Sequence, residues 1–123
     1  MYEFDPNIPI YLQIVNGIKR EIVSGARQPG DRLPSVREQA ESLAVNPNTV
    51  QRAYQELERE GVCDTRRGTG SYISERDGLI TALRDEMARA LRRAYAEGMR
   101  ALGFTDEEIL SALRAELDGG RAT

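Results

Sequence analysis

Histidine and tryptophan are absent from this chain of 123 residues, and cysteine occurs once, at Cys63. A single cysteine excludes an intrachain disulfide and suits a reducing compartment. With one cysteine and no histidine, zinc, copper and haem sites are not expected, and histidine-based catalysis is excluded. We therefore expect no metal, no cofactor and no enzymatic activity.

Long apolar runs are also missing. No segment reaches the roughly 20 apolar residues that a membrane-spanning helix needs, and no basic-then-apolar signal segment begins the chain. Hydrophobic residues make up 40% of the sequence, which suffices for the core of one domain, or of a small domain with an appendage. The sequence predicts a soluble, cytoplasmic protein.

The formal net charge of −3 is unlike that of most DNA-binding domains, which are basic. However, sixteen of the seventeen basic residues are arginine, the residue that makes bidentate bonds to phosphate or guanine. Five of them fall at one predicted edge of the molecule: Arg32, Arg37, Arg52, Arg66 and Arg67. The global charge weakens long-range attraction to an acidic partner without excluding local contact.

Cap residues mark the first two helices. Residues 1–8 are expected to be unstructured, and a helix is expected to begin near Pro9 and to stop at Gly25. Residues 26–34 contain prolines and a glycine, which predict a turn and a short extended piece. Ser35, with Glu38 three residues on, forms a capping box that begins the second helix.

A third helix and a hairpin follow. Asn46 caps the third helix, Pro47 occupies its first position, and Gly61 ends it. Two strands, about residues 62–67 and 71–74, are joined by Gly68, Thr69 and Gly70, which supply the positive φ angles of a tight hairpin. A helix-turn-helix beside a two-stranded wing is a device for placing one helix in the major groove of DNA.

The outer face of the third helix has the chemistry to contact bases. A helical projection puts Asn48, Arg52, Gln55 and Arg59 opposite the apolar side, with Thr49 and Gln51 flanking them. Amide side chains bond adenine, arginine bonds guanine, and threonine contacts the thymine methyl group. Glu56, Glu58 and Glu60 would be repelled by phosphates, so we expect the first two turns to enter the groove.

Other interpretations of single residues remain open. Arg37 could form a surface ion pair with Glu41, four residues on, instead of contacting DNA. Cys63 is most simply a small buried hydrophobe, whereas a redox sensor would need an exposed thiolate.

The rest of the chain is predicted to be helical. One helix spans residues 79–102, and a second begins after a capping box of Thr105 and Glu108. Residues 119–123 are expected to fray. The apolar stripes of these helices are expected to bury against a second copy or against the first helix, and their members are Ile80, Leu83, Met87, Leu91, Tyr95, Ile109, Leu113 and Leu117.

Several segments together resemble the GntR family of winged-helix regulators, in particular its YtrA-like branch. They include Pro9 to Ile14, Pro29 to Arg37, Val45 to Val50, Arg52 to Tyr54 and Gly68 to Gly70. The resemblance covers about residues 9–74 and implies that these members contact operator DNA: Pro34, Ser35, Arg37, Asn46, Asn48, Thr49, Arg52, Thr69 and Gly70. It also implies a dimeric repressor, often encoded beside transporter genes.

These inferences predict a mainly α fold with a small β-wing: an N-terminal winged helix-turn-helix (residues 1–75) followed by a two-helix C-terminal dimerisation arm (residues 76–123). Charge and position add Arg32, Gln51, Arg66, Arg67 and Gly68 to the DNA-contacting residues. The predicted function is a homodimeric, sequence-specific regulator, most simply a repressor, that binds a palindromic operator. The alternatives are a winged-helix protein-interaction module with only non-specific DNA binding, and a sensor with a small pocket at the tail for an unknown small-molecule effector.

Overall fold

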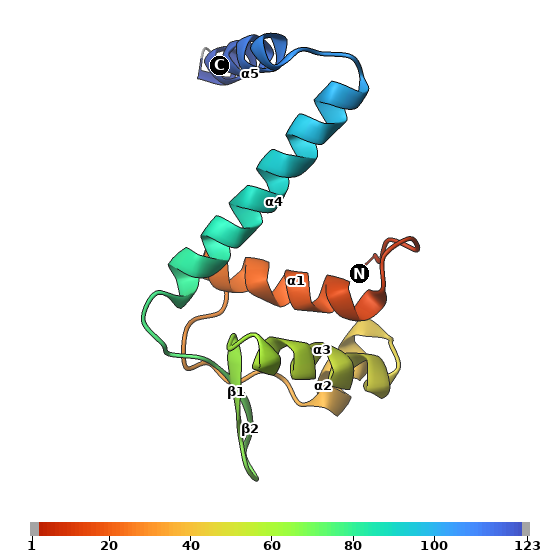
Figure 1. Cartoon of the computed structure of the whole chain (residues 1–123). Helices are drawn as coiled ribbons and strands as arrows, with labels where there is room; N and C mark the ends of the chain where they lie inside the picture. The colour runs from red at the N-terminus through yellow and green to blue at the C-terminus, as the bar shows by residue number, and fades with distance from the viewer. Residues whose placement is uncertain (1–2, 122–123) are drawn as a thin grey trace. The chain divides into compact units, whose positions relative to one another are not determined.

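The structure is a computed structural model and describes residues 3–121. Over that range it confirms the predicted fold class, a mainly helical chain with one two-stranded antiparallel sheet. The elements, labelled in Figure 1, are α1 (Ile10–Ser24), α2 (Val36–Leu43), α3 (Pro47–Arg59), β1 (Cys63–Arg66), β2 (Gly70–Ile73), α4 (Leu79–Ala101) and α5 (Asp106–Arg121). The chain divides into two compact units, here called the winged unit (Met1–Arg84) and the tail unit (Asp85–Thr123).

α2 and α3 begin, and α1 ends, where the cap residues of the sequence predict. The backbone N–H of Glu38 donates to Ser35 Oγ at 3.1 Å, and the N–H of Ser35 donates to Glu38 Oε1 at 2.9 Å, which completes the capping box. Asn46 Oδ1 accepts from the N–H of Asn48 at 2.8 Å. Gly25 ends α1 in the left-handed conformation, with φ at +88°.

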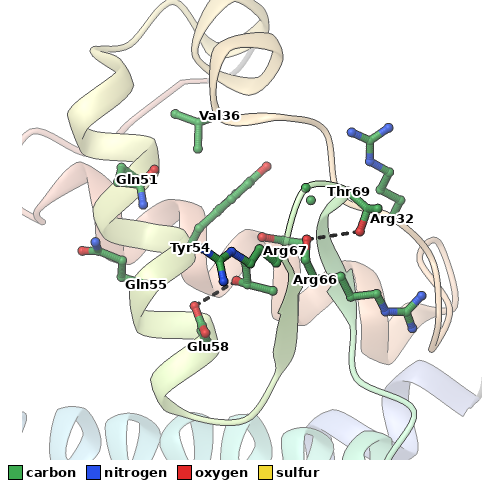
Figure 2. Close-up of a pocket in the computed structure, with 13 residues that line it drawn as sticks. Arg32, Val36, Gln51, Tyr54, Gln55, Glu58, Arg66, Arg67 and Thr69 are labelled. Carbon is green, nitrogen blue, oxygen red and sulfur yellow. Dashed lines mark hydrogen bonds between the residues drawn. The ribbon is translucent and has the colours of Figure 1, made fainter.

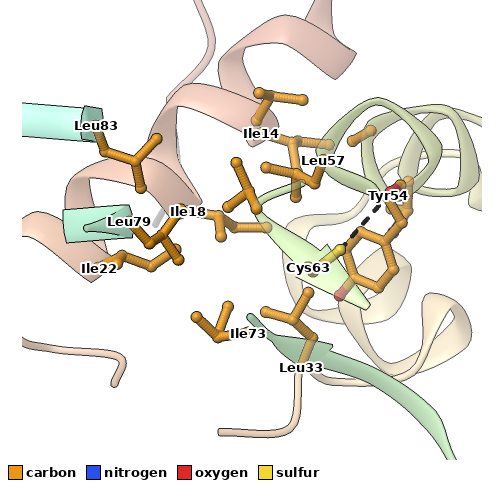
Figure 3. Packing of buried hydrophobic residues seen from close by; sticks show 14 of the residues in the cluster. Ile14, Ile18, Ile22, Leu33, Tyr54, Leu57, Cys63, Ile73, Leu79 and Leu83 are labelled. Atoms are coloured by element: carbon orange, nitrogen blue, oxygen red, sulfur yellow. Dashed lines mark hydrogen bonds between the residues drawn. The ribbon is translucent and has the colours of Figure 1, made fainter. Parts of the chain in front are cut away.

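The core of the winged unit lies where α1, α3, the wing and the first turns of α4 meet (Figure 3). Its buried members are Ile14, Val15, Ile18, Ile22, Leu33, Ala40, Val50, Ala53, Tyr54, Leu57, Val62, Cys63, Ile73, Leu79 and Leu83. Leu79 and Leu83 come from α4, so this helix begins inside the winged unit and ends in the tail unit.

The wing is more than a hairpin. β1 and β2 pair in antiparallel register, with Cys63 opposite Ile73 and Arg66 opposite Gly70. Residues 30–33 then bond the outer edge of β2: the N–H of Gly30 donates to Ile73 O, the N–H of Ile73 to Asp31 O, and the N–H of Leu33 to Ser71 O, each at 2.8 Å. The segment predicted as a turn and an extended piece therefore holds the wing to the helices.

The residues before α1 make more contacts than expected. Phe4 packs against the core, and the side-chain amide of Gln13 donates to Asp5 O and Ile8 O at 2.8 Å. The prediction of an unstructured lead-in is therefore wrong for residues 4–8, because α1 supplies partners for their backbone; residues 1–2 lie outside the described range.

The tail unit consists of the remainder of α4 and of α5. Thr105 and Glu108 form the predicted capping box, with N···O distances of 3.2 and 2.9 Å. α5 continues through its two glycines to Arg121, so the predicted fraying is wrong as far as that residue, and residues 122–123 lie outside the described range. Among residues 85–120, Ile109 is the only one that is buried.

Each helix within residues 3–121 is too short or too polar to cross a membrane.

Candidate nucleic-acid interface

An open groove of about 430 Å³ separates α3 from the wing (Figure 2). It is lined by Arg32, Val36, Gln51, Tyr54, Gln55, Glu58, Thr65, Arg66, Arg67, Gly68, Thr69, Gly70 and Ser71. Seven of the fourteen predicted DNA-contacting residues are thus brought to one place: Arg32, Gln51, Arg66, Arg67 and the wing turn from Gly68 to Gly70 line the groove.

Two glutamines form the α3 side of this groove. Gln51 and Gln55 are exposed and leave the helix one turn apart (Figure 2). Among residues 3–121 the structure gives neither side-chain amide a hydrogen-bond partner. Gln51 is one of the predicted contact residues. Gln55 is not one of them, although the helical projection puts Gln55 on the outer face of the helix. Because Gln55 also lines the groove, it joins Gln51 as a candidate contact residue.

The arginines of the wing point in two directions. Figure 2 shows Arg67 extending from the wing across the groove toward α3, while Arg32 and Arg66 lie on the other side of the wing. The guanidinium carbon of Arg66 stacks over the ring of Tyr72, 4.0 Å from its centroid. Arg66 is the last residue of β1 and Arg67 the first of the turn, so the two side chains leave the wing in different directions.

Arg52 lies against α1 instead of in the groove. Its guanidinium carbon is 3.9 Å from the centroid of the Tyr11 ring. Arg37, in the first turn of α2, is exposed and does not line the groove. The structure shows no ion pair between Arg37 and Glu41 among residues 3–121, so the guanidinium of Arg37 stays open to an external anion.

Several predicted contact residues already use polar atoms to position the helices. The carbonyl of Pro34 accepts the hydroxyl of Tyr54 at 2.7 Å, which joins α3 to the start of α2, and burial raises the pKa of Tyr54 to about 12. Ser35 Oγ and Asn46 Oδ1 are cap acceptors. The exposed Asn48 and half-buried Thr49 follow in the first turn of α3. The bond between Tyr54 and Pro34 thus ties α3 to the start of α2, while the caps at Ser35 and Asn46 fix where the two helices begin.

Two glycines allow the tight turn of the wing. Gly68 has φ at +80° and Gly70 at +120°, values that side-chain-bearing residues rarely adopt. A Cβ atom on Gly70 would lie 3.0 Å from Nε of Arg32. The hydroxyl of Thr69, between them, donates to the carbonyl of Arg66 at 3.1 Å. Gly70 therefore serves both the turn and the close approach of Arg32.

The acidic side chains of α3 are not spread over the groove. Glu56 accepts from Nε of Arg59 at 2.9 Å, a bond that lowers the pKa of Glu56 to about 2. Glu60 pairs with the buried Lys19 of α1 at 2.6 Å, and burial raises the pKa of the Glu60 carboxyl. Only Glu58 lines the groove, where its carboxylate accepts the hydroxyl of Thr65 at 2.9 Å. The expected repulsion of phosphate is therefore confined to Glu58 within the groove.

Cys63 is buried, as the simplest interpretation predicts. It is 1% exposed, its thiol lies 3.9 Å from Tyr54 O, and burial raises its pKa to about 11. A thiolate nucleophile is therefore disfavoured at this position.

The predicted dimerisation residues fall into two groups. Leu83 is buried in the winged unit and Ile109 in the tail unit. The others are exposed or half-buried, with Leu91 72%, Leu117 56% and Ile80 40% exposed, and Tyr95, Leu113 and Met87 less so. Leu83 therefore serves the core, whereas Leu91 and Leu117 are open to another molecule.

The family model for bacterial regulatory proteins of the gntR family matches residues 10–73. This range contains the helix-turn-helix, the wing and the groove between them. The chain belongs to the GntR family and is a DNA-binding transcriptional regulator by class, as the motifs predicted. Members of this family are regulators and not enzymes.

Individual relatives match over nearly the whole chain. The chain is 42% identical over 118 residues to the uncharacterized HTH-type transcriptional regulator YhcF of Bacillus subtilis (strain 168), covering 96% of this chain and 98% of that protein. It is 38% identical over 129 residues to the HTH-type transcriptional repressor YtrA of the same organism, with 98% of each covered. A solved GntR family transcriptional regulator from Listeria monocytogenes has a TM-score of 0.82 and 44% identity, covering 91% of this chain and 98% of that chain.

Proposed function

We propose that this protein is a cytoplasmic, homodimeric repressor that binds a palindromic operator through α3 and the wing. The groove between these two elements is the observation that carries the proposal. It combines unpaired amides on α3 with Arg67 on the wing, so that base-contacting and phosphate-contacting groups face one space.

The electrostatics of the winged unit support contact with phosphate despite the acidic total charge. Glu56 and Glu60 are neutralised by Arg59 and Lys19. The N-terminus of α3, where the helix dipole is positive, carries no acidic residue in its first turn. A local positive field at the α3 end and the wing is sufficient for short-range binding.

The tail unit supports the proposal of a dimer. Apart from Ile109 its apolar side chains are exposed or half-buried, and Leu91, Leu110 and Leu117 are each more than half exposed. A unit of fewer than about 40 residues rarely folds without an added partner, metal or disulfide. A second copy would cover these side chains, and its two-fold symmetry would place the two wings on related half-sites about one helical turn apart. The name of the relative YtrA supports repression.

Selection from a randomised duplex pool at near-physiological salt tests the proposal. We expect a palindrome to be enriched, and light scattering of the free protein to give the mass of two chains. Weak binding without enrichment, together with a protein partner, would favour the winged-helix interaction module instead. A monomer at micromolar concentration would contradict the dimer even if one half-site were enriched.

A further inference from the structure

We propose that Gln51 and Gln55 make α3 select A·T base pairs at two nearby positions of each operator half-site. This inference rests on the proposed function and adds to it the class of base that α3 contacts. It follows from three features of the groove: the free amides of Gln51 and Gln55, the engagement of both α3 arginines elsewhere, and the spacing of the two glutamines along the helix.

The two amides are available for an outside partner. Both side chains are exposed and line the groove, and the structure assigns neither a hydrogen bond within residues 3–121. Each amide carries a donor and an acceptor on one planar group. Adenine presents the complementary pair in the major groove, an N7 acceptor and an N6 donor, and a bidentate bond between them discriminates against the other bases.

The arginines of α3, which would select guanine, are directed elsewhere. Arg52 is stacked on Tyr11 of α1, and Arg59 is bound to Glu56. The arginine that does enter the groove, Arg67, comes from the wing and not from α3. Guanine presents two acceptors, which arginine or lysine contacts most often, whereas the groove side of α3 offers amides, the groups that pair with the donor and acceptor of adenine.

The spacing of the glutamines predicts where the two base pairs lie. Residues four apart are separated by about 6 Å along a helix axis, and base pairs are stacked about 3.4 Å apart. The two amides therefore span one to two base-pair steps. One turn further along, the Glu58 carboxylate is held by Thr65, and its charge keeps the following turns away from phosphate.

The test uses the full chain and the operator obtained by selection. Each adenine of the half-site is replaced, one at a time, by 7-deazaadenine, which keeps Watson–Crick pairing but lacks the N7 acceptor. Fluorescence anisotropy then measures the affinity of each duplex. For the native protein we expect two positions at which affinity falls about tenfold. The Gln51→Ala variant should lose the sensitivity at one of them, and Gln55→Ala at the other.

Gln28→Ala is the matched control, because Gln28 is an exposed glutamine in the turn before the wing segment and lines no part of the groove. It should keep both sensitivities. If a variant fails to melt cooperatively, the inference is tested by the native protein alone, through the number of adenines at which 7-deazaadenine lowers its affinity. An enriched palindrome without two N7-sensitive adenines in each half-site would overturn the inference and leave the proposed function intact. If no sequence is enriched, the proposed function fails, and the inference fails with it.

Discussion

The winged unit and the tail unit differ in what covers their apolar side chains. The winged unit buries a core of fifteen residues, drawn from every helix and strand within it, whereas residues 85–120 bury only Ile109. The winged unit thus has the core of an independent domain. The tail unit has amphipathic helices with their apolar sides still exposed, so its stability should depend on another chain.

Two identical substitutions in α4 make the strongest test of this difference. Leu83 is 3% exposed and Leu91 is 72% exposed, although both lie on the same helix. Leu83→Glu should lower the free energy of unfolding of the winged unit by about 3 kcal/mol or more, because it removes core packing and buries a carboxylate. Urea denaturation followed by circular dichroism measures the loss.

Leu91→Glu is the counterpart. It should leave the winged unit folded and separate the proposed dimer, which light scattering would detect as a halved mass. Dimers that persist in Leu91→Glu would show that this part of α4 is outside the interface. A stable Leu83→Glu would show that the first turns of α4 are dispensable for the core.

Alkaline pH should act on the winged unit next most strongly. Burial raises the pKa of Tyr54 to about 12 and that of Cys63 to about 11, above their ordinary values near 10 and 8.5. The unfolded chain releases these protons first, so stability is fully present below about pH 8.5 and falls as pH rises toward 12. Unfolding midpoints measured between pH 8 and 12 should decline less in Cys63→Ala and Tyr54→Phe, and equal slopes in all three proteins would refute this cause.

Removing one exposed arginine from each unit compares their roles in DNA binding. Arg37→Ala should weaken operator binding and reduce the slope of log affinity against log salt by about 1, because one phosphate contact is lost. Arg93 is an exposed residue of α4 in the tail unit, so Arg93→Ala is the matched control. It should change neither the affinity for the operator nor the salt slope. Titrations at several salt concentrations decide this, and an unaltered salt slope in Arg37→Ala would remove Arg37 from the interface.

The smallest effect is expected from Arg52→Ala. The stack on Tyr11 is worth about 0.5–1 kcal/mol at an exposed site, so the melting temperature should fall slightly. Affinity for the operator should fall less than in Arg37→Ala. A larger loss of affinity than of stability would return Arg52 to the base-contacting residues that the helical projection predicted.

Features that depend on neighbouring residues were predictable from the sequence. The capping box at Ser35, the cap at Asn46 and the glycine turn of the wing are set by atoms a few residues apart, and each appears where predicted. The groove-lining arginines at the wing could also be predicted, because a hairpin turn fixes which residues lie beside it.

Features that depend on distant residues were not predictable. The helical projection placed Arg52 away from the core, but it could not show that Tyr11 of α1 lies within reach. The apolar period of α4 marked Leu83 and Leu91 alike, because periodicity gives a face and not the partner that covers it. Residues 30–33 have no strand pattern of their own, and their pairing with β2 depends on the tertiary fold.

The burial of the single cysteine has a practical consequence for labelling chemistry. Because the Cys63 thiol is buried and its pKa is raised, thiol-reactive dyes and spin labels should not react with it at neutral pH. The native chain therefore already behaves as a cysteine-free background. One cysteine introduced on the wing turn would be the sole reactive group, and a pair of labelled chains would report the separation of two wings on DNA.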